Sequence, residues 1–165
     1  MNSILNKFSS LIRGLVFFLT VISGLGIIFM MFITCLDIIL RIVGYPIIGV
    51  YDIIKVSSAI TISCALPYTT AVKGHVSVEY FFHKLNRRGR VIVDTVTRVL
   101  TMTFFGLLAY RCFQYGIALY NSGEATSTLQ IPTFWVMYVI SFSCVIVVFV
   151  IFEHLLHPGK EMIKP

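Results

Sequence analysis

The sequence has 165 residues, of which 58% are hydrophobic and only 12% are charged. A soluble domain usually carries about 25% charged residues, so this composition excludes a water-soluble globule and indicates a protein largely surrounded by lipid. The formal net charge is +6, and a basic edge facing anionic lipid explains this charge more simply than a nucleic-acid partner does.

Four apolar stretches, each long enough to cross a bilayer, follow one another along the chain. A bilayer core of about 30 Å needs roughly 20 apolar residues in a helix, and four such helices use most of this sequence. We therefore predict an all-α integral membrane protein that forms a single membrane domain over residues 1–165. The predicted transmembrane helices cover residues 14–38, 53–72, 91–119 and 131–155.

The first span has no charge over residues 14–36. It is longer than the apolar core of a signal peptide, which has about 7–15 residues, so we expect a retained helix. Asp37 and Arg41 follow four residues apart, in the order that favours an ion pair on one helix face. Asp52 and Lys55 lie at the entrance of the second span, where we expect them to act as structural ion-pair or interface residues.

The loop between the second and third spans contains an apolar stripe. Val78, Phe81, Phe82 and Leu85 recur at the spacing of one helix face, as in an amphipathic helix. We expect a short amphipathic helix lying in the membrane interface, and the alternative is a two-turn extension of a neighbouring span. The same loop contains a basic edge that we expect to face cytoplasmic lipid, formed by Lys73, Lys84, Arg87, Arg88 and Arg90.

The third span contains charged residues along its length. Asp94 and Arg98 have the spacing of a helical ion pair. Twelve uncharged residues separate Arg98 from Arg111, which places the two arginines roughly 20 Å apart along the axis. Each can extend its long side chain toward its own interface, and Asp37 and Asp52 are the nearest acidic residues to Arg111 by depth. We expect structural ion pairs or interface positions here, with an ion or substrate pathway as the alternative.

The distribution of Lys and Arg indicates the orientation of the spans. The amino-terminal segment, the middle loop and the carboxyl-terminal tail are basic, whereas residues 120–130 contain neither Lys nor Arg. Because basic residues concentrate on the cytoplasmic side of membrane proteins, we expect both termini and the middle loop in the cytoplasm.

The sequence contains no recognisable set of catalytic or metal-binding residues. The four histidines, His75, His83, His154 and His157, all fall near one edge of the membrane, whereas a haem held between spans needs ligands at membrane depth. The four cysteines lack the spacing of a metal site or a disulfide framework. We therefore expect no catalytic residue, no metal and no cofactor, and hence no enzyme.

Four short segments carry a family resemblance. The most specific is a Lys-x-His-Val-x-Val-Glu run at residues 73–79, and the others are residues 37–41, 49–52 and 127–135. With these segments the chain resembles, over nearly its whole length, the small membrane subunit of tripartite ATP-independent periplasmic (TRAP) transporters, the DctQ-like family. One departure is Asp52, which stands where that family more often has Glu.

The resemblance implies partners, a location and a function. Family members pair with a large multi-span permease subunit that houses the sodium and substrate sites. A periplasmic binding protein delivers an organic acid, such as a C4-dicarboxylate or sialic acid, to this complex. The small subunit is then a scaffold in the bacterial inner membrane that supports sodium-coupled uptake, and spans with nearly uncharged interiors fit a subunit that does not itself conduct.

Two other classes of membrane protein remain as alternatives. One is a stand-alone four-span transporter built from identical chains, although such a protein usually needs an acidic residue deep within a span. The other is a tetraspan membrane anchor protein without a role in transport. Uptake by this chain in the absence of other subunits would identify the first alternative, and the lack of a transport partner would identify the second.

Overall fold

The computed structural model describes residues 2–72 and 87–156, and this part of the chain folds into four long helices. Their bounds are Asn2–Ile42 for α1, Val50–Ala71 for α2, Arg87–Ser122 for α4 and Phe134–Leu156 for α5. Each helix contains a segment long and apolar enough to cross a membrane: Ser10–Ile42, Val50–Ala71, Thr95–Ser122 and Phe134–Glu153. The predicted all-helical architecture with four spans is confirmed, whereas the amphipathic helix expected within residues 76–85 lies outside the described residues.

The first helix is longer than the span predicted for it. It contains 41 residues, which correspond to roughly 60 Å at 1.5 Å per residue. The hydrocarbon core of a bilayer is only about 30 Å thick. α1 therefore crosses the membrane at a tilt, extends beyond the hydrocarbon core, or does both.

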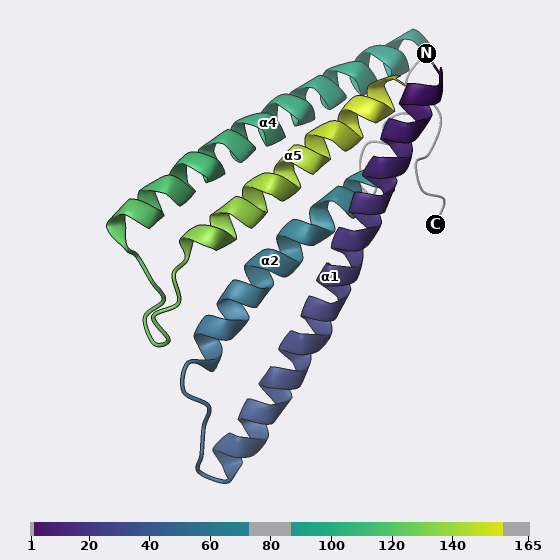
Figure 1. Ribbon diagram of the computed structural model, residues 1–165. Coiled ribbons are helices and arrows are strands. Elements are labelled where there is room, and N and C mark those ends of the chain that lie inside the picture. The colour runs from purple at the N-terminus through teal and green to yellow at the C-terminus, as the bar shows by residue number, and fades with distance from the viewer. Residues whose placement is uncertain (1, 73–86, 157–165) are drawn as a thin grey trace.

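The four helices lie side by side in the order α4, α5, α2 and α1 (Figure 1). Neighbours in this row pack against each other, and α1 also reaches α5. Figure 1 shows the helices close together where α1 begins and spread apart at the opposite end. We call this opposite end the loop end, because it carries the loops of residues 43–49 and 123–133. The four helices thus form a fan-shaped layer, which we call the fan, and its two outer helices, α1 and α4, are its edges.

The core lies where α1, α2 and α5 converge. Its α1 members recur three or four residues apart and so share one face of that helix. The buried cluster consists of Ile12, Val16, Leu19, Cys64, Ala71, Ile146 and Val150. Because lipid is as apolar as these side chains, their packing stabilises the fold mainly through close van der Waals contact.

Several hydroxyl side chains in the spans find hydrogen-bond acceptors within the protein, although Oγ of Ser143 on α5 is buried without a partner in the described residues. Thr20 donates to the carbonyl oxygen of Val16 at 2.8 Å, as is expected where lipid offers no acceptor. Ser141 instead donates across helices, from its Oγ on α5 to the carbonyl oxygen of Ala109 on α4 at 2.8 Å. This bond fixes the register of α4 against α5.

Candidate functional site at the loop end

Backbone conformations in the left-handed region shape both loops at the loop end. Gly44 and Gly49 have φ values of 88° and 81° in the α1–α2 loop, and Gly123 has a φ of 66° after α4. Glycine adopts these values without the steric cost that a side chain imposes. Gln130 also has a positive φ, of 54°. The paths of the two loops therefore depend on the left-handed backbone conformation at these four positions.

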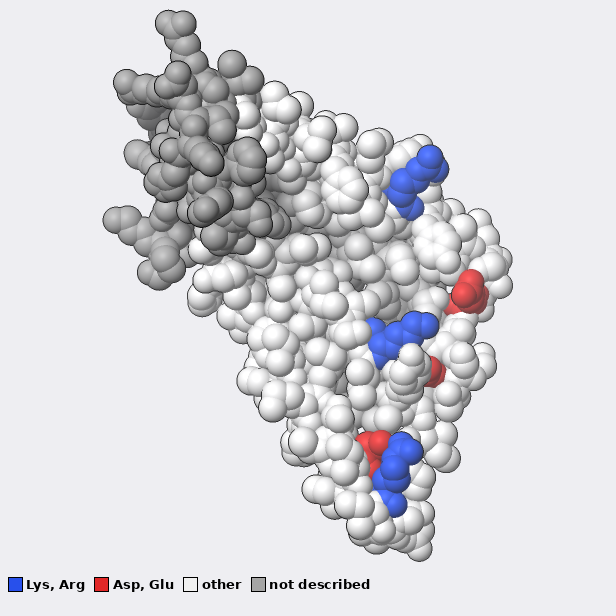
Figure 2. Space-filling view, turned by 180° about the vertical axis from the view of Figure 1, so that it is seen from behind, with Lys and Arg blue, Asp and Glu red and all other residues white. Residues whose placement is uncertain are grey.

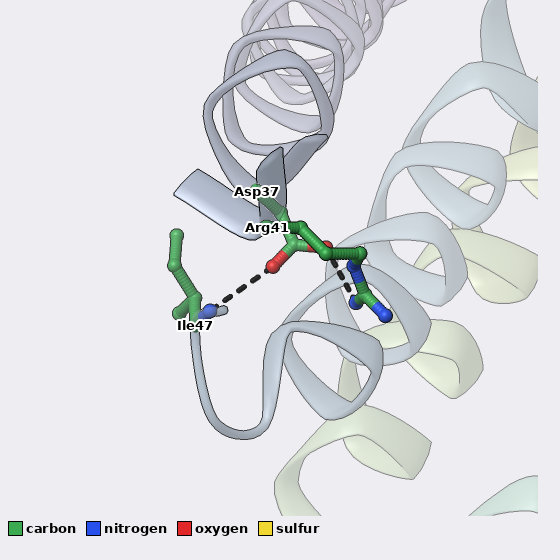
Figure 3. A network of polar contacts seen from close by, with 3 residues as sticks. All are labelled: Asp37, Arg41 and Ile47. Atoms are coloured by element: carbon green, nitrogen blue, oxygen red, sulfur yellow. Dashed lines mark hydrogen bonds and ion pairs between the residues drawn. The ribbon is translucent and has the colours of Figure 1, made fainter. Parts of the chain in front are cut away.

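Asp37 links the end of α1 to the loop that follows it. Its Oδ2 accepts a hydrogen bond from Nη2 of Arg41 at 2.9 Å, and its Oδ1 accepts one from the backbone N–H of Ile47 at 3.1 Å (Figure 3). The side chain of Asp37 is 9% exposed, whereas that of Arg41 is 65% exposed. Because an exposed ion pair contributes little stability, the bond to Ile47 is the contact that fixes the path of the loop.

Asp52 connects α2 to the distant α4–α5 loop. Its Oδ2 accepts hydrogen bonds from the backbone N–H groups of Thr128 at 2.8 Å and Leu129 at 3.0 Å. Asp52 is only 4% exposed. A charged carboxylate is a strong acceptor for two converging N–H groups. We call this arrangement the Asp52 clamp, and it joins the α4–α5 pair to α2 at the end where the helices spread apart (Figure 1).

The α4–α5 loop folds back on itself and so presents its tip to Asp52. An isolated antiparallel bridge joins Ala125 to Pro132. The backbone N–H of Thr126 donates to the carbonyl oxygen of Ile131 at 2.9 Å, and the hydroxyl of Thr126 accepts from the N–H of Ile131 at 3.0 Å. These bonds leave the N–H groups at the tip directed to the carboxylate of Asp52.

Leu129 also packs over Gly49, the residue that precedes α2. A Cβ atom at position 49 would overlap the side chain of Leu129. Gly44 offers a contrast, because it also has a positive φ but a Cβ there would meet nothing within 4 Å. Gly49 is therefore required both by its backbone conformation and by the lack of space.

We expect Gly49→Ala to destabilise the protein more than Gly44→Ala. Both variants place a side chain in the left-handed region, at a cost of about 1–2 kcal/mol, but only Gly49→Ala adds steric overlap, which typically costs about 1–3 kcal/mol. Thermal unfolding of the purified variants in detergent measures the difference. Adding Leu129→Ala to Gly49→Ala should recover part of the loss, and equal melting temperatures for the two single variants would contradict the proposed overlap.

Other charged residues singled out in the sequence do not join these contacts. Lys55 is exposed and does not reach ion-pair distance of Asp52 within the described part of the chain. Figure 2 shows that the charged side chains on one broad face lie along a single edge, with an uncharged surface beside them. Charged side chains therefore lie near the loop end, but they do not converge on a single binding site.

Arg111 has neither an ion pair nor a hydrogen bond among the described residues, and its side chain is exposed on α4. The two acidic residues expected nearest to it are engaged elsewhere, Asp37 with Arg41 and Asp52 with the loop tip. Arg98 is half-buried. The remaining predicted positions lie outside the described residues or have side chains outside them: Lys73, Lys84, Arg87, Arg88, Arg90 and Asp94.

Sequence reasoning missed the partner of Asp52 and the environment of Glu153. The residues that bind Asp52 contribute backbone N–H groups, which no side-chain pattern reveals. One usable signal was that residues 49–52 and 127–135 both carried the family resemblance. Oε2 of Glu153, near the other end of α5, is buried and has no hydrogen-bond partner in the described structure.

The contacts at the loop end stabilise loops and do not form a reaction centre. Within residues 2–72 and 87–156, no group of three His, Cys, Asp or Glu side chains is placed to hold a metal ion. Residues 30–159 match the family model described as tripartite ATP-independent periplasmic transporters, DctQ component. The chain belongs to this family. This DctQ protein is thus the small membrane subunit of a TRAP transporter, in a family of transporter subunits and not of enzymes.

The family match includes the segments that form the loop end. It begins within α1 before Asp37 and continues past Asp52 and the α4–α5 loop to the end of α5. Comparison with curated proteins and with solved structures gives no match for the DctQ chain.

Proposed function

We propose that this DctQ subunit is a scaffold that supports a large permease subunit in sodium-coupled, binding-protein-dependent uptake of an organic acid. The proposal depends chiefly on how the carboxylates of the loop end are used. Asp37 and Asp52 bind the chain's own loops, so in the described residues they do not converge on a space where an ion or a substrate could bind. The sodium and substrate sites then belong to the large subunit.

The subunit resides in the bacterial inner membrane with both termini and the middle loop in the cytoplasm. Four candidate spans support placing the two termini on the same side, and the basic segments favour the cytoplasm for that side. The loop end then faces the periplasm, where the binding protein delivers its substrate. The Asp52 clamp keeps the two loops in a fixed arrangement on this side.

Reconstitution in proteoliposomes tests the proposed division of labour. The DctQ subunit would be incorporated alone, with a large TRAP permease subunit, and with both that permease and its binding protein. We expect uptake of a radiolabelled organic acid only in the third preparation, under an inward sodium gradient, and no uptake when an ionophore collapses the gradient. Sodium-driven uptake by the DctQ subunit alone would contradict the scaffold role and support a stand-alone transporter.

A further inference from the structure

The two edges of the fan expose different chemistry. Over residues 17–36 of α1 the exposed side chains are apolar apart from Thr34 and Cys35. The hydroxyl of Thr34 is satisfied within its own helix, because it donates to the carbonyl oxygen of Met30 at 2.7 Å. This surface suits contact with lipid tails. Its most exposed large side chains are those of Phe17, Phe18, Leu25, Ile28, Met31 and Phe32.

The other edge, α4, exposes polar groups in the half nearer the loop end. Tyr110 is 57% exposed and Tyr115 is 53% exposed. Nε2 of Gln114 donates to the hydroxyl of Tyr110 at 2.7 Å, whereas Arg111 has no partner in the described residues. A shallow groove of about 530 Å³ runs along the same surface, lined by Arg111, Cys112, Gln114, Tyr115 and Ala118.

Register against α5 places Arg111 inside the hydrocarbon core. The hydrogen bond between Ser141 and Ala109 sets these two residues at the same level. Ser141 lies seven residues after Phe134, the first residue of α5, and so roughly 10 Å inward of that helix start at 1.5 Å per residue. Arg111 lies two residues after Ala109, toward the loop end, which places it roughly 7–8 Å inward of the start of α5. α5 has 23 residues, close to the roughly 20 needed to cross the core. The start of α5 therefore marks the membrane edge.

An arginine at this depth requires a partner. Ionisable side chains within spans almost always face other helices, pair with an opposite charge or line a pathway. Arg111 instead lies on an edge helix. In an apolar stretch of 18 residues in α4 only 6% of the residues are buried, compared with 44% in the corresponding stretch of α5. The partner of Arg111 must therefore come from outside the described chain, as either a lipid phosphate or another protein.

The neighbouring polar groups favour a protein. An arginine facing lipid can extend toward a phosphate at the interface, but the surface around Arg111 also carries two exposed tyrosines, Tyr110 and Tyr115, and the groove. Arginine and tyrosine are enriched at protein–protein interfaces. A second protein surface accounts for the arginine, the tyrosines and the groove together, whereas a lipid headgroup accounts only for Arg111.

We propose that the Arg111 face of α4, which we define as Tyr110, Arg111, Gln114, Tyr115 and Ala118, is the surface that binds the large permease subunit. An acidic side chain of that subunit pairs with Arg111, and the α1 edge faces lipid. This assignment rests on the proposed function, because it requires a large permease partner. Beyond the proposed function, it specifies that the α4 edge of the fan contacts the permease and that the permease contributes a negative charge.

Photo-crosslinking at two exposed aromatic positions tests the assignment. Benzoylphenylalanine would replace Tyr115 on the Arg111 face or Phe32 on the α1 edge, in membranes that contain both subunits. We expect illumination to give a product with the combined mass of both subunits from position 115 and not from position 32. Lipid adducts alone at position 115, in a complex that still co-purifies, would overturn the assignment. Failure of the unmodified subunits to co-purify would instead contradict the proposed function.

Substitution of Arg111 tests the charge of the partner. Truncating one member of a buried ion pair usually lowers affinity strongly, so we expect Arg111→Ala to reduce recovery of the large subunit in a pull-down by about tenfold or more. Arg111→Lys should retain most of the recovery, and Arg111→Glu should be the most damaging. Phe32→Ala is the matched control on the α1 edge and should change nothing. Unchanged recovery with Arg111→Glu would overturn the pairing.

Discussion

Replacing Asp52 with alanine is expected to release the α4–α5 loop from α2 and to lower the melting temperature of the subunit by several degrees. The substitution removes the acceptor of two backbone N–H groups, those of Thr128 and Leu129. Asp52 is almost fully buried, so water has little access to replace it. An unsatisfied buried donor costs more free energy than a hydrogen bond contributes on average.

The loss should also change the environment of the only tryptophan. Trp135 lies at the start of α5, close to the loop in sequence, and is 37% exposed. We expect its emission to shift when the loop is released, and the same signal can follow thermal unfolding in detergent. The Asp52 clamp connects α2 to the α4–α5 loop, so its loss should allow α2 and the α4–α5 pair to move apart at the loop end.

Two further variants separate the charge of Asp52 from its role as an acceptor. Asp52→Asn keeps a carbonyl oxygen that can accept both bonds, so its melting temperature should fall between those of the wild type and Asp52→Ala. Glu124→Ala is the control, because Glu124 belongs to the same loop but its side chain is exposed. Wild-type stability in Asp52→Ala would contradict the clamp, and equal losses in Asp52→Asn and Asp52→Ala would assign the effect to charge.

The four spans could be predicted because lipid imposes a simple requirement on sequence. A helix that crosses a bilayer needs about 20 apolar residues whatever packs against it. Helix ends are harder to predict, as the continuation of α1 to Ile42 past Asp37 illustrates. Charges mark the edge of the hydrocarbon, whereas a helix satisfies its own backbone in water as well as in lipid. Charged residues therefore do not mark where a membrane helix stops.

The order of the helices in the fan could not be predicted from the sequence. In a soluble protein the apolar face of a helix indicates its packing side, but a membrane helix is apolar toward both lipid and its neighbours. α1 shows this, because Val16 is fully buried whereas Phe17 and Phe18 are exposed. The same limit applied to the Asp52 clamp, which joins residues separated by 76 positions. The contact between Asp37 and Arg41 was accessible because it lies within one helical turn.

Introducing leucine at Gly26 is expected to separate α1 from α2. A Cβ atom at this position would overlap Oγ1 of Thr61 on α2 and come within 3.4 Å of its Cβ. Small residues permit such close approach between membrane helices, and this contact replaces the hydrophobic driving force available in water. Overpacking a tight contact typically costs about 1–3 kcal/mol and occasionally more, and a whole leucine side chain should reach the upper part of that range.

Gly24 supplies a matched control on the same helix. It lies two residues before Gly26, and a Cβ there would meet nothing within 4 Å. Gly24→Leu should therefore leave the melting temperature in detergent nearly unchanged, or raise it slightly through the higher helix propensity of leucine. Equal destabilisation by the two leucine substitutions would contradict a specific contact at Gly26 and point to a general effect of replacing glycine in α1.

A compensating change on α2 identifies the atom responsible. Thr61→Ala removes Oγ1, the nearest obstacle to a Cβ at position 26, and leaves only an ordinary close contact. Gly26→Ala should therefore destabilise the wild-type protein but be tolerated in the Thr61→Ala background. Gly26→Leu should remain destabilising in both backgrounds, because the longer side chain has no space between the two helices. Persistent loss in the alanine double variant would show that backbone separation, and not the Thr61 hydroxyl, limits the contact.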